Sequence, residues 1–535
     1  METSRATEPS AAAPEQQPGG RPGRIARSTA FFSAATAASR VAGLVREIVA
    51  AGYYGTSGPM SAFTIAFQVP NLIRSLFADA ALQPAFVPVF TELLERGERR
   101  QAFRLAATML LLVTMALGAV TALFVLAAPL VMPLFAPGFE GPILELTVSL
   151  SRLLFPILVL LGVSGIVVGV LNSYDRFGAF AIAPFFWNVT IIAVLVAIEP
   201  LFDGRDRIYA YAIGILAGTL VQLLIPTFDL RNTPFRFRPV LAWRHPGVRR
   251  VLVLMLPVTI SLGLINFNLV INSLFGSLVS DRAPAAIDKA FRIYQLPQGI
   301  FSVAIATVLF PTLSRFASRG AAADLRATLA NGMRQILFVL VPAAAAVVVL
   351  AEPMIRVVYE RGAFDAADTE VVSTALFWFA FSLPTNGIFL LLTRTFFSLQ
   401  RPWIPTAISG ANLALTALAA LALYRLGVGG IVAATAIATA ASVAAQTVVL
   451  RALLGGLELG RLLGTALRIA AAAAALAAVG RLVWDALDGP LGGGLPGQVA
   501  ALACALALGA AAYLGAARLL RIAELDQILR LVRRR

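Results

Sequence analysis

Long apolar segments recur along almost the whole chain and are separated by short polar loops. A helix needs about 20 apolar residues, each rising about 1.5 Å, to cross the ~30 Å hydrocarbon core of a bilayer. The pattern predicts about fourteen such helices, near residues 28–54, 60–92, 102–134, 143–172, 178–199, 208–229, 248–279, 285–314, 327–359, 367–398, 403–424, 428–453, 462–486 and 495–519. Prolines in the second, eighth and tenth segments indicate that these helices are kinked or split.

The charges of the loops give an independent test of this count, because one missed span would invert the alternation beyond it. Arginine collects in every second loop, whereas the intervening loops are acidic or mixed. Examples of the two loop types are Arg99, Arg176, Arg238, Arg319 and Arg401 on one side, and Glu140, Asp203, Asp281, Asp365 and Asp488 on the other. Lys and Arg accumulate in cytoplasmic loops, so both termini are expected in the cytoplasm of a multi-pass protein of the plasma or inner membrane.

The composition excludes several classes of function. The 535 residues are 59% hydrophobic and only 13% charged, too little polar surface for a water-soluble globule. One cysteine and one histidine exclude an internal disulfide and a Cys/His metal cluster, and no phosphate-binding loop of the GxxxxGK[ST] type occurs. We therefore expect no enzyme, no metal and no cofactor. The net charge of +15 resides in the loops, so nucleic acid is not an expected partner.

An internal repeat divides the chain. The stretch from Ala66 to Pro70, reaching Pro88, recurs from Ala290 to Pro297, reaching Pro311, about 224 residues later. An even number of spans separates the copies, so the halves would be related by an axis along the membrane normal, as in many transporters. Chance likeness of proline-containing apolar helices is the alternative. The expected organisation is a disordered tail (1–27), an N-terminal lobe (28–230), a basic linker (231–247), a C-terminal lobe (248–454), two further helices (455–521) and a basic tail (522–535).

Ionisable residues inside the apolar segments are the candidate functional groups. They are Arg40, Arg46 and Glu47 in the first segment, Arg74 and Asp79 in the second, and Asp288, Lys289 and Arg292 in the eighth. An arginine at the bilayer centre costs roughly 2.5–3.5 kcal/mol on insertion scales, so several facing lipid would be prohibitive. We expect a shared aqueous cavity that selects an anion, because guanidinium groups grip phosphate oxygens bidentately. Snorkelling to headgroups, or private ion pairs such as Arg46 with Glu47, is the competing explanation.

Several of these motifs resemble one family. Ser39 to Glu47, Phe67 to Arg74, Asn172 to Phe177, Arg292 to Pro297 and Tyr359 to Phe364 are similar, in order, to the signature of the MurJ (MviN) lipid II flippases. The resemblance covers about residues 28–460. It implies an all-α fold of the MOP superfamily, MATE-like, with two six-helix lobes and two additional C-terminal helices. It also implies transfer of an undecaprenyl-pyrophosphate-linked peptidoglycan precursor from the inner to the outer leaflet by alternating access.

The family's essential cavity arginines fall on Arg40, Arg46, Arg74 and Arg292. Residues expected to support the cavity or its closure are Ser39, Glu47, Asn71, Asp79 and Gln295. The chain departs from the family where many members have an aspartate at Ser61, and where some have a glutamate at Gln295. Both differences remove a negative charge, which puts closure through those carboxylates in doubt.

The expected partners are lipid II and membrane lipids, with cell-wall synthesis or division proteins as further candidates. Two alternative functions stay open. One is export of another polyprenyl-linked glycan or an anionic compound, and the other is a non-transporting membrane scaffold for cell-wall synthesis.

Overall fold

The computed structural model of this protein describes residues 22–77, 82–491 and 494–526, and the regular elements within these ranges are all helices. The helices of the first part are α1 (Pro22–Tyr54), α2 (Gly58–Phe77), α3 (Leu82–Glu95), α4 (Arg99–Phe135), α5 (Gly141–Leu154), α6 (Ile157–Asn172), α7 (Gly178–Ile198) and α8 (Ile208–Asp229). Those of the second part are α9 (Pro246–Val279), α10 (Ala283–Pro297), α11 (Val303–Ser318), α12 (Ala322–Tyr359), α13 (Ala366–Ala380), α14 (Ser382–Ser398), α15 (Trp403–Leu423), α16 (Val428–Leu454), α17 (Leu459–Leu487) and α18 (Leu495–Leu519).

Among the described residues, ten helical segments are long and apolar enough to span a membrane. The pair α13 and α14, bent by 44°, forms an eleventh. The expected spans that correspond to α1, to α2 with α3 and to α9 are not among these eleven; the described part Phe267–Val279 of α9 is a shorter apolar helix. The chain is therefore a multi-pass, all-helical membrane protein.

Two of the three proline-containing segments, the eighth and the tenth, are interrupted as expected. In the eighth segment, a π-helical turn over Gln298–Ser302 follows Pro297 and separates α10 from α11. The bend in the tenth segment lies at Phe381, between α13 and α14. In the second segment the structure describes α2 to Phe77 and α3 from Leu82, and residues 78–81 between them lie outside the described residues. A further break, between α5 and α6 at Phe155 and Pro156, was not expected, although a proline inside a helix removes one backbone hydrogen bond.

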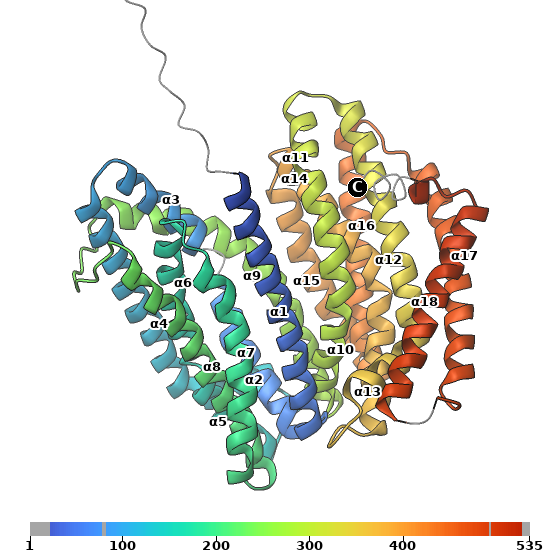
Figure 1. The fold of residues 1–535 in the computed structure, drawn as a ribbon, viewed down its shortest axis with the longest axis horizontal. Coiled ribbons are helices and arrows are strands. Elements are labelled where there is room, and N and C mark those ends of the chain that lie inside the picture. The colour runs from blue at the N-terminus through green and yellow to red at the C-terminus, as the bar shows by residue number, and fades with distance from the viewer. Residues whose placement is uncertain (1–21, 78–81, 492–493, 527–535) are drawn as a thin grey trace, which may run out of the picture.

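Two groups of helices pack side by side (Figure 1). We call α1–α8 the N-terminal half and α9–α16 the C-terminal half. Helix α9 contacts α2, α3 and α4 as well as α10, α15 and α16, so it joins the halves. Helices α17 and α18 pack against each other and against α12, at the outer edge of the C-terminal half.

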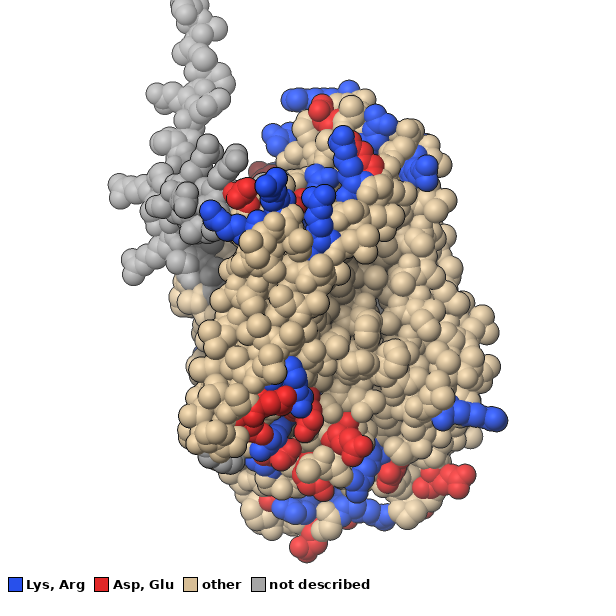
Figure 2. All heavy atoms as spheres, turned by 90° about the vertical axis from the view of Figure 1, so that its right-hand side faces the viewer, with Lys and Arg blue, Asp and Glu red and all other residues tan. Residues whose placement is uncertain are grey.

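Charged side chains gather at the two ends of the molecule and leave an apolar band between them (Figure 2). The basic end carries the turn between α11 and α12, with Arg315 and Arg319. Arg481 and Asp485 form an ion pair of 3.0 Å in the last turns of α17, at the opposite end. This distribution matches a helical bundle whose middle is surrounded by lipid.

Two features lie near the expected boundaries. Helix α1 is described from Pro22, ahead of the expected end of the tail at residue 27. The linker 231–247 packs on α4: its Val240 carbonyl accepts a hydrogen bond of 2.9 Å from the Thr108 hydroxyl. His245 then caps α9, with its Nδ1 accepting from the Gly247 amide at 3.1 Å. Residues 1–21 and 527–535 of the predicted tails lie outside the described residues.

Candidate functional site

Arg46 and Glu47 are both buried in the middle of α1 and form an ion pair with each other. The guanidinium of Arg46 also lies over the ring of Trp187, 4.6 Å from its centroid. Trp187 is on α7, which packs along α1. The ring of Trp187 and the carboxylate of Glu47 together offset the free-energy cost of burying Arg46, which is only 6% exposed.

Arg292 brings the C-terminal half to the same carboxylate. Its Nη1 lies 3.1 Å from Oε1 of Glu47, and its Nε lies 2.9 Å from Oδ2 of Asp288, one turn earlier on α10. Glu47 is therefore shared by one arginine from each half. Such charge-assisted contacts fix the orientation of the guanidinium groups.

Arg74 is half-buried near the end of α2, and its Nε donates to Oδ1 of Asn71 at 3.0 Å. Pro70 lies inside the same helix, directly before Asn71. The i, i+3 spacing places Asn71 and Arg74 on one face, so the amide orients the guanidinium. Asp79, the acidic residue expected nearby, lies outside the described residues.

Arg46, Arg74 and Arg292 line one cavity of about 350 Å³ between the halves, which we call the arginine cavity. Its other lining residues are Phe67, Pro70, Asn71, Ile157, Leu161, Pro184, Trp187, Thr219 and Gln222. Three guanidinium groups and no carboxylate face this space among the described lining residues, so it suits an anionic group. The structure thus brings together three of the four expected arginines.

Arg40 is exposed and is not among the residues that line the arginine cavity. It lies nearly two turns before Arg46 on α1, and its neighbour Ser39 uses its backbone carbonyl to accept a hydrogen bond of 3.4 Å from Asn188 on α7. The roles expected for Arg40 and Ser39 stay predictions.

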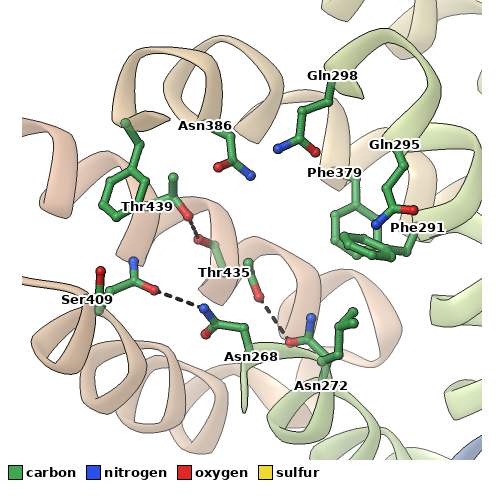
Figure 3. A pocket seen from close by; sticks show the side chains of 13 residues that line it. Asn268, Asn272, Phe291, Gln295, Gln298, Phe379, Asn386, Ser409, Thr435 and Thr439 are labelled. Carbon is green, nitrogen blue, oxygen red and sulfur yellow. Dashed lines mark hydrogen bonds between the residues drawn. The ribbon is translucent and has the colours of Figure 1, made fainter. Parts of the chain in front are cut away.

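A second cavity, of about 280 Å³, lies within the C-terminal half (Figure 3). We call it the amide cavity, because carboxamides and hydroxyls line it together with three phenylalanines and a leucine. The polar lining residues are Asn268, Asn272, Gln295, Gln298, Asn386, Ser409, Asn412, Thr435 and Thr439. Gln295, expected to support the arginine cavity, lies here instead, one turn beyond Arg292 on α10.

Hydrogen bonds hold the amides of this cavity in place. Asn268 donates to Asn412 at 3.2 Å, and Asn412 donates to Ser442 at 2.9 Å. Thr435 donates to Asn272 at 3.0 Å. The polar lining carries no charge and offers both hydrogen-bond donors and acceptors, so the cavity suits the neutral polar groups of a ligand.

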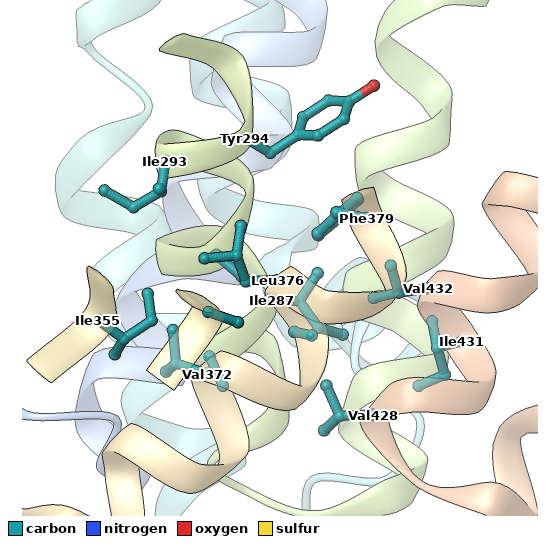
Figure 4. Close-up of a cluster of buried hydrophobic side chains, with 14 of the residues drawn as sticks. Ile287, Ile293, Tyr294, Ile355, Val372, Leu376, Phe379, Val428, Ile431 and Val432 are labelled. Atoms are coloured by element: carbon teal, nitrogen blue, oxygen red, sulfur yellow. The ribbon is translucent and has the colours of Figure 1, made fainter. Parts of the chain in front are cut away.

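Helix α10 contributes to both cavities and is anchored by an apolar cluster (Figure 4). Ile287 and Ile293 of α10 are buried against Ile355 of α12 and Leu376 of α13. The packing fixes the direction in which α10 presents Arg292 to one cavity and Phe291 and Gln295 to the other.

The two halves also meet at the end opposite the arginine-rich loops, in contacts that we call the inter-half seam. Asp368 at the start of α13 accepts hydrogen bonds from the Thr56 amide, at 3.1 Å, and from the Thr56 hydroxyl. The Ala363 amide donates to the Gly52 carbonyl at 2.7 Å. A Cβ at Gly362, whose φ is +63°, would overlap that carbonyl, so the close approach requires glycine.

Ser61 belongs to this seam as well. Its hydroxyl accepts a hydrogen bond of 3.1 Å from the Ala285 amide in the first turn of α10. A hydroxyl thus connects α2 to α10 at the position where a carboxylate was expected from the resemblance, and the unpaired amides of a helix start supply the partner.

Sequence reasoning missed Trp187 and Asp368. A tryptophan in an apolar segment is an ordinary packing residue, and Asp368 was counted only as part of an acidic loop. The Tyr359 to Phe364 motif was the available signal for the seam, because Gly362 and Ala363 belong to it.

The chain is similar to proteins of one family. The profile of the family described as "Lipid II flippase MurJ" matches residues 50–487. "Probable lipid II flippase MurJ" of Rhizobium meliloti is 36% identical over 432 residues, covering 77% of this chain and 78% of the relative. "Lipid II flippase MurJ" of Burkholderia cenocepacia is 30% identical over 398 residues, covering 73% of this chain and 77% of the relative.

Solved structures show the same fold. "Lipid II flippase MurJ, inward closed conformation" superposes with a TM-score of 0.73 at 21% identity, covering 90% of this chain and 97% of that one. An inward-facing multidrug resistance MATE family transporter of the MOP superfamily reaches 0.65 at 15% identity, covering 78% of this chain and 94% of that one.

Proposed function

The chain belongs to the MurJ family of lipid II flippases, and we propose that it carries the lipid II headgroup across the membrane through the arginine cavity. The observation that carries the mechanism is the convergence of Arg46, Arg74 and Arg292, from both halves, on one space. The pyrophosphate would exchange its water for these guanidinium groups, while the undecaprenyl tail stays in the lipid. Arg40 would add a fourth cation along the route.

The amide cavity would receive the uncharged part of the headgroup. Its carboxamides and hydroxyls match the hydroxyl and amide groups of a sugar and a peptide, and its phenylalanines offer apolar faces. Because α10 separates the two cavities by about one helical turn, from Arg292 to Gln295, one headgroup can occupy both.

The finer architecture is part of the proposal. We infer fourteen spans, in two lobes related by a two-fold pseudo-axis along the membrane normal, with α17 and α18 added. Support comes from the residues at which corresponding helices begin. Helix α1 begins at residue 22 and α9 at 246, α2 begins at 58 and α10 at 283, and α7 begins at 178 and α15 at 403. Similar spacing of all three pairs fits an internal repeat.

Orientation follows from the loops. We place the arginine-rich end in the cytoplasm, with both termini, and the inter-half seam at the outer face of the plasma or inner membrane. With the seam closed, the arginine cavity would be reached from the inner leaflet. Opening the seam while closing the other end would release the headgroup outside, which is alternating access.

The direct test is a leaflet-exposure assay for lipid II in cells depleted of this protein and complemented with variants. Arg74→Ala and Arg292→Ala should abolish exposure on the outer leaflet at unchanged protein abundance. Arg292→Lys is the matched control, because it keeps the charge but loses the bidentate fork, and intermediate exposure is expected. Full transport by an Arg46, Arg74, Arg292 triple alanine variant would refute the mechanism.

Two alternatives make different predictions. If the passenger were another polyprenyl-linked glycan, the purified protein would bind that glycan more tightly than lipid II. If the protein were a scaffold, deleting residues 1–21 and 527–535 would destroy function, whereas the flippase needs neither tail for transport.

A further inference from the structure

Lys289 is the only lysine in a chain that has 43 basic residues, and it is fully buried on α10. Its Nζ has no hydrogen-bond acceptor among the described protein groups. The ring of Tyr359 on α12, with its centroid 5.5 Å from Nζ, is the aromatic face beside it. Burial of an ammonium group without a paired carboxylate is unfavourable, so a lysine at this position demands an explanation beyond packing.

Three carboxylates act on the charge of Lys289, and an arginine lies within ion-pair distance of each of them. Glu47 and Asp288 act on the Lys289 charge, as do Arg292 on the same helix and, more weakly, Asp368 on α13. Glu47 is bound by Arg46 and Arg292 through Oε1, and its Oε2 has no partner among the described groups. Lys289 and Glu47 thus interact electrostatically, and each has a buried polar atom, Nζ and Oε2, without a hydrogen-bond partner among the described groups.

The contacts of Arg292 conflict with phosphate binding. A guanidinium grips an oxyanion through two adjacent N–H groups, either Nε with Nη2 or Nη1 with Nη2. Nε is committed to Asp288, at 2.9 Å, and Nη1 to Glu47, at 3.1 Å. Phosphate on the Nε–Nη2 edge would displace Asp288, and phosphate on the Nη1–Nη2 edge would compete with Glu47 for Nη1.

The side chain of Glu47 is 5% exposed and that of Asp288 is 16% exposed. A released Asp288 can be hydrated from the cavity, whereas a released Glu47 is a buried anion without a counter-ion. We propose that Lys289 is the replacement counter-ion, which binds Glu47 when Arg46 and Arg292 turn to the pyrophosphate. This inference rests on the proposed function, and it makes Lys289 a positioning residue that acts through Glu47.

Lysine suits this task better than arginine. Its ammonium group is a compact charge on a flexible four-carbon chain. It can therefore lie beside Tyr359 in the absence of ligand and extend to the Glu47 carboxylate when the ligand binds. An arginine at position 289 would bind the Glu47 carboxylate bidentately at all times. Arg292 would then lose its contact with Glu47 in the protein without ligand.

A double-mutant cycle tests the inference on the full chain in lipid nanodiscs, with undecaprenyl pyrophosphate as the probe. Lys289→Met should weaken binding by roughly 10-fold or more in the wild-type background and by less than about 2-fold in a Glu47→Gln background, because the neutral amide needs no counter-ion. Thermal stability without ligand should not fall in Lys289→Met, since no hydrogen bond is lost.

The single lysine supplies a second readout. In protein labelled with isotopic lysine, one side-chain NMR signal should shift on adding the probe, and the shift should vanish in Glu47→Gln. Equal loss of binding in both backgrounds, or an immobile lysine signal, would overturn the inference while leaving the flippase mechanism standing. Absence of binding by the wild-type protein would overturn the proposed function, and this inference with it.

Discussion

Glu47 and Arg292 meet across the two halves of the molecule, with 3.1 Å between Oε1 and Nη1. One residue lies on α1 and the other on α10, so the contact exists only while the halves keep their present relation. The charge that recruits an anion is thus also a charge that binds the halves together. Ligand binding and the relative position of the halves are expected to influence each other.

We expect the Asp368→Asn variant to open the inter-half seam. Asp368 is 4% exposed and accepts two hydrogen bonds from Thr56, and Arg282 lies 3.8 Å away. A hydrogen bond to a charged group contributes ~1.5–3 kcal/mol, so weakening one should shift the closed-to-open ratio about tenfold or more. Spin labels at Glu140 and Glu370, in a Cys504→Ser background, would report a longer distance population. An unchanged distance distribution would mean that the seam is held by other contacts.

The amide cavity should contribute to headgroup recognition without contributing to phosphate binding. Asn272→Leu and Asn412→Leu remove the donor and acceptor of each lining amide and keep a branched side chain with the same number of heavy atoms. Each lost hydrogen bond is worth about 0.5–1.5 kcal/mol, so lipid II should bind roughly 3- to 10-fold more weakly. Affinity for undecaprenyl pyrophosphate, which has no sugar, should stay unchanged. An equal loss of affinity for both ligands would show that these amides serve only the packing of the C-terminal half.

Gly218 of α8 lets α7 approach closely enough to place Trp187 against Arg46. A Cβ at Gly218 would lie 2.8 Å from the Trp187 carbonyl oxygen, closer than real contacts allow. We expect Gly218→Ala to destabilise the protein by about 1–3 kcal/mol and to weaken anion binding. Gly410→Ala in α15 is the control, since its Cβ would meet nothing within 4 Å, and thermal unfolding should be unchanged or slightly higher.

His245 should make stability depend on pH. Burial, followed by the nearby Arg104, lowers the pKa of His245 from 6.5, consistent with a neutral ring whose Nδ1 accepts from Gly247. The folded state binds this proton less readily than the unfolded state. The cap therefore stabilises fully above about pH 6.5 and is lost as the pH falls through the lowered pKa. Thermal melts between pH 7 and pH 5 should show this loss in the wild type relative to His245→Asn, which keeps an uncharged cap.

Much of the fold follows from local sequence properties. The apolar segments located the helices, and prolines located the breaks near Pro297 and Phe381. The energetic cost of arginine in hydrocarbon was enough to select Arg46, Arg74 and Arg292. What the segments cannot reveal is which groups far apart in the chain share a contact. The placing of Arg40 outside the cavity depends on how α1 packs against α7, and the pairing of Thr56 with Asp368 depends on how the turn after α1 meets the start of α13.

The amide cavity was missed for a related reason. Asparagine and threonine in membrane helices commonly link one helix to the next, so Asn268, Asn272 and Thr435 carry no sign of a cavity. Lys289 was noticed as a charge, but its burial without a partner is a property of the packed cluster and not of the segment that contains it.

The hydrogen bond from the Ala363 amide to the Gly52 carbonyl joins two stretches of main chain. Both partners are peptide groups, so the hydrogen bond itself needs no particular side chain at position 52 or 363. The neighbouring Gly362 is the exception, because a Cβ there would overlap the Gly52 carbonyl, and selection on this contact should therefore fall on a residue that forms no bond in it.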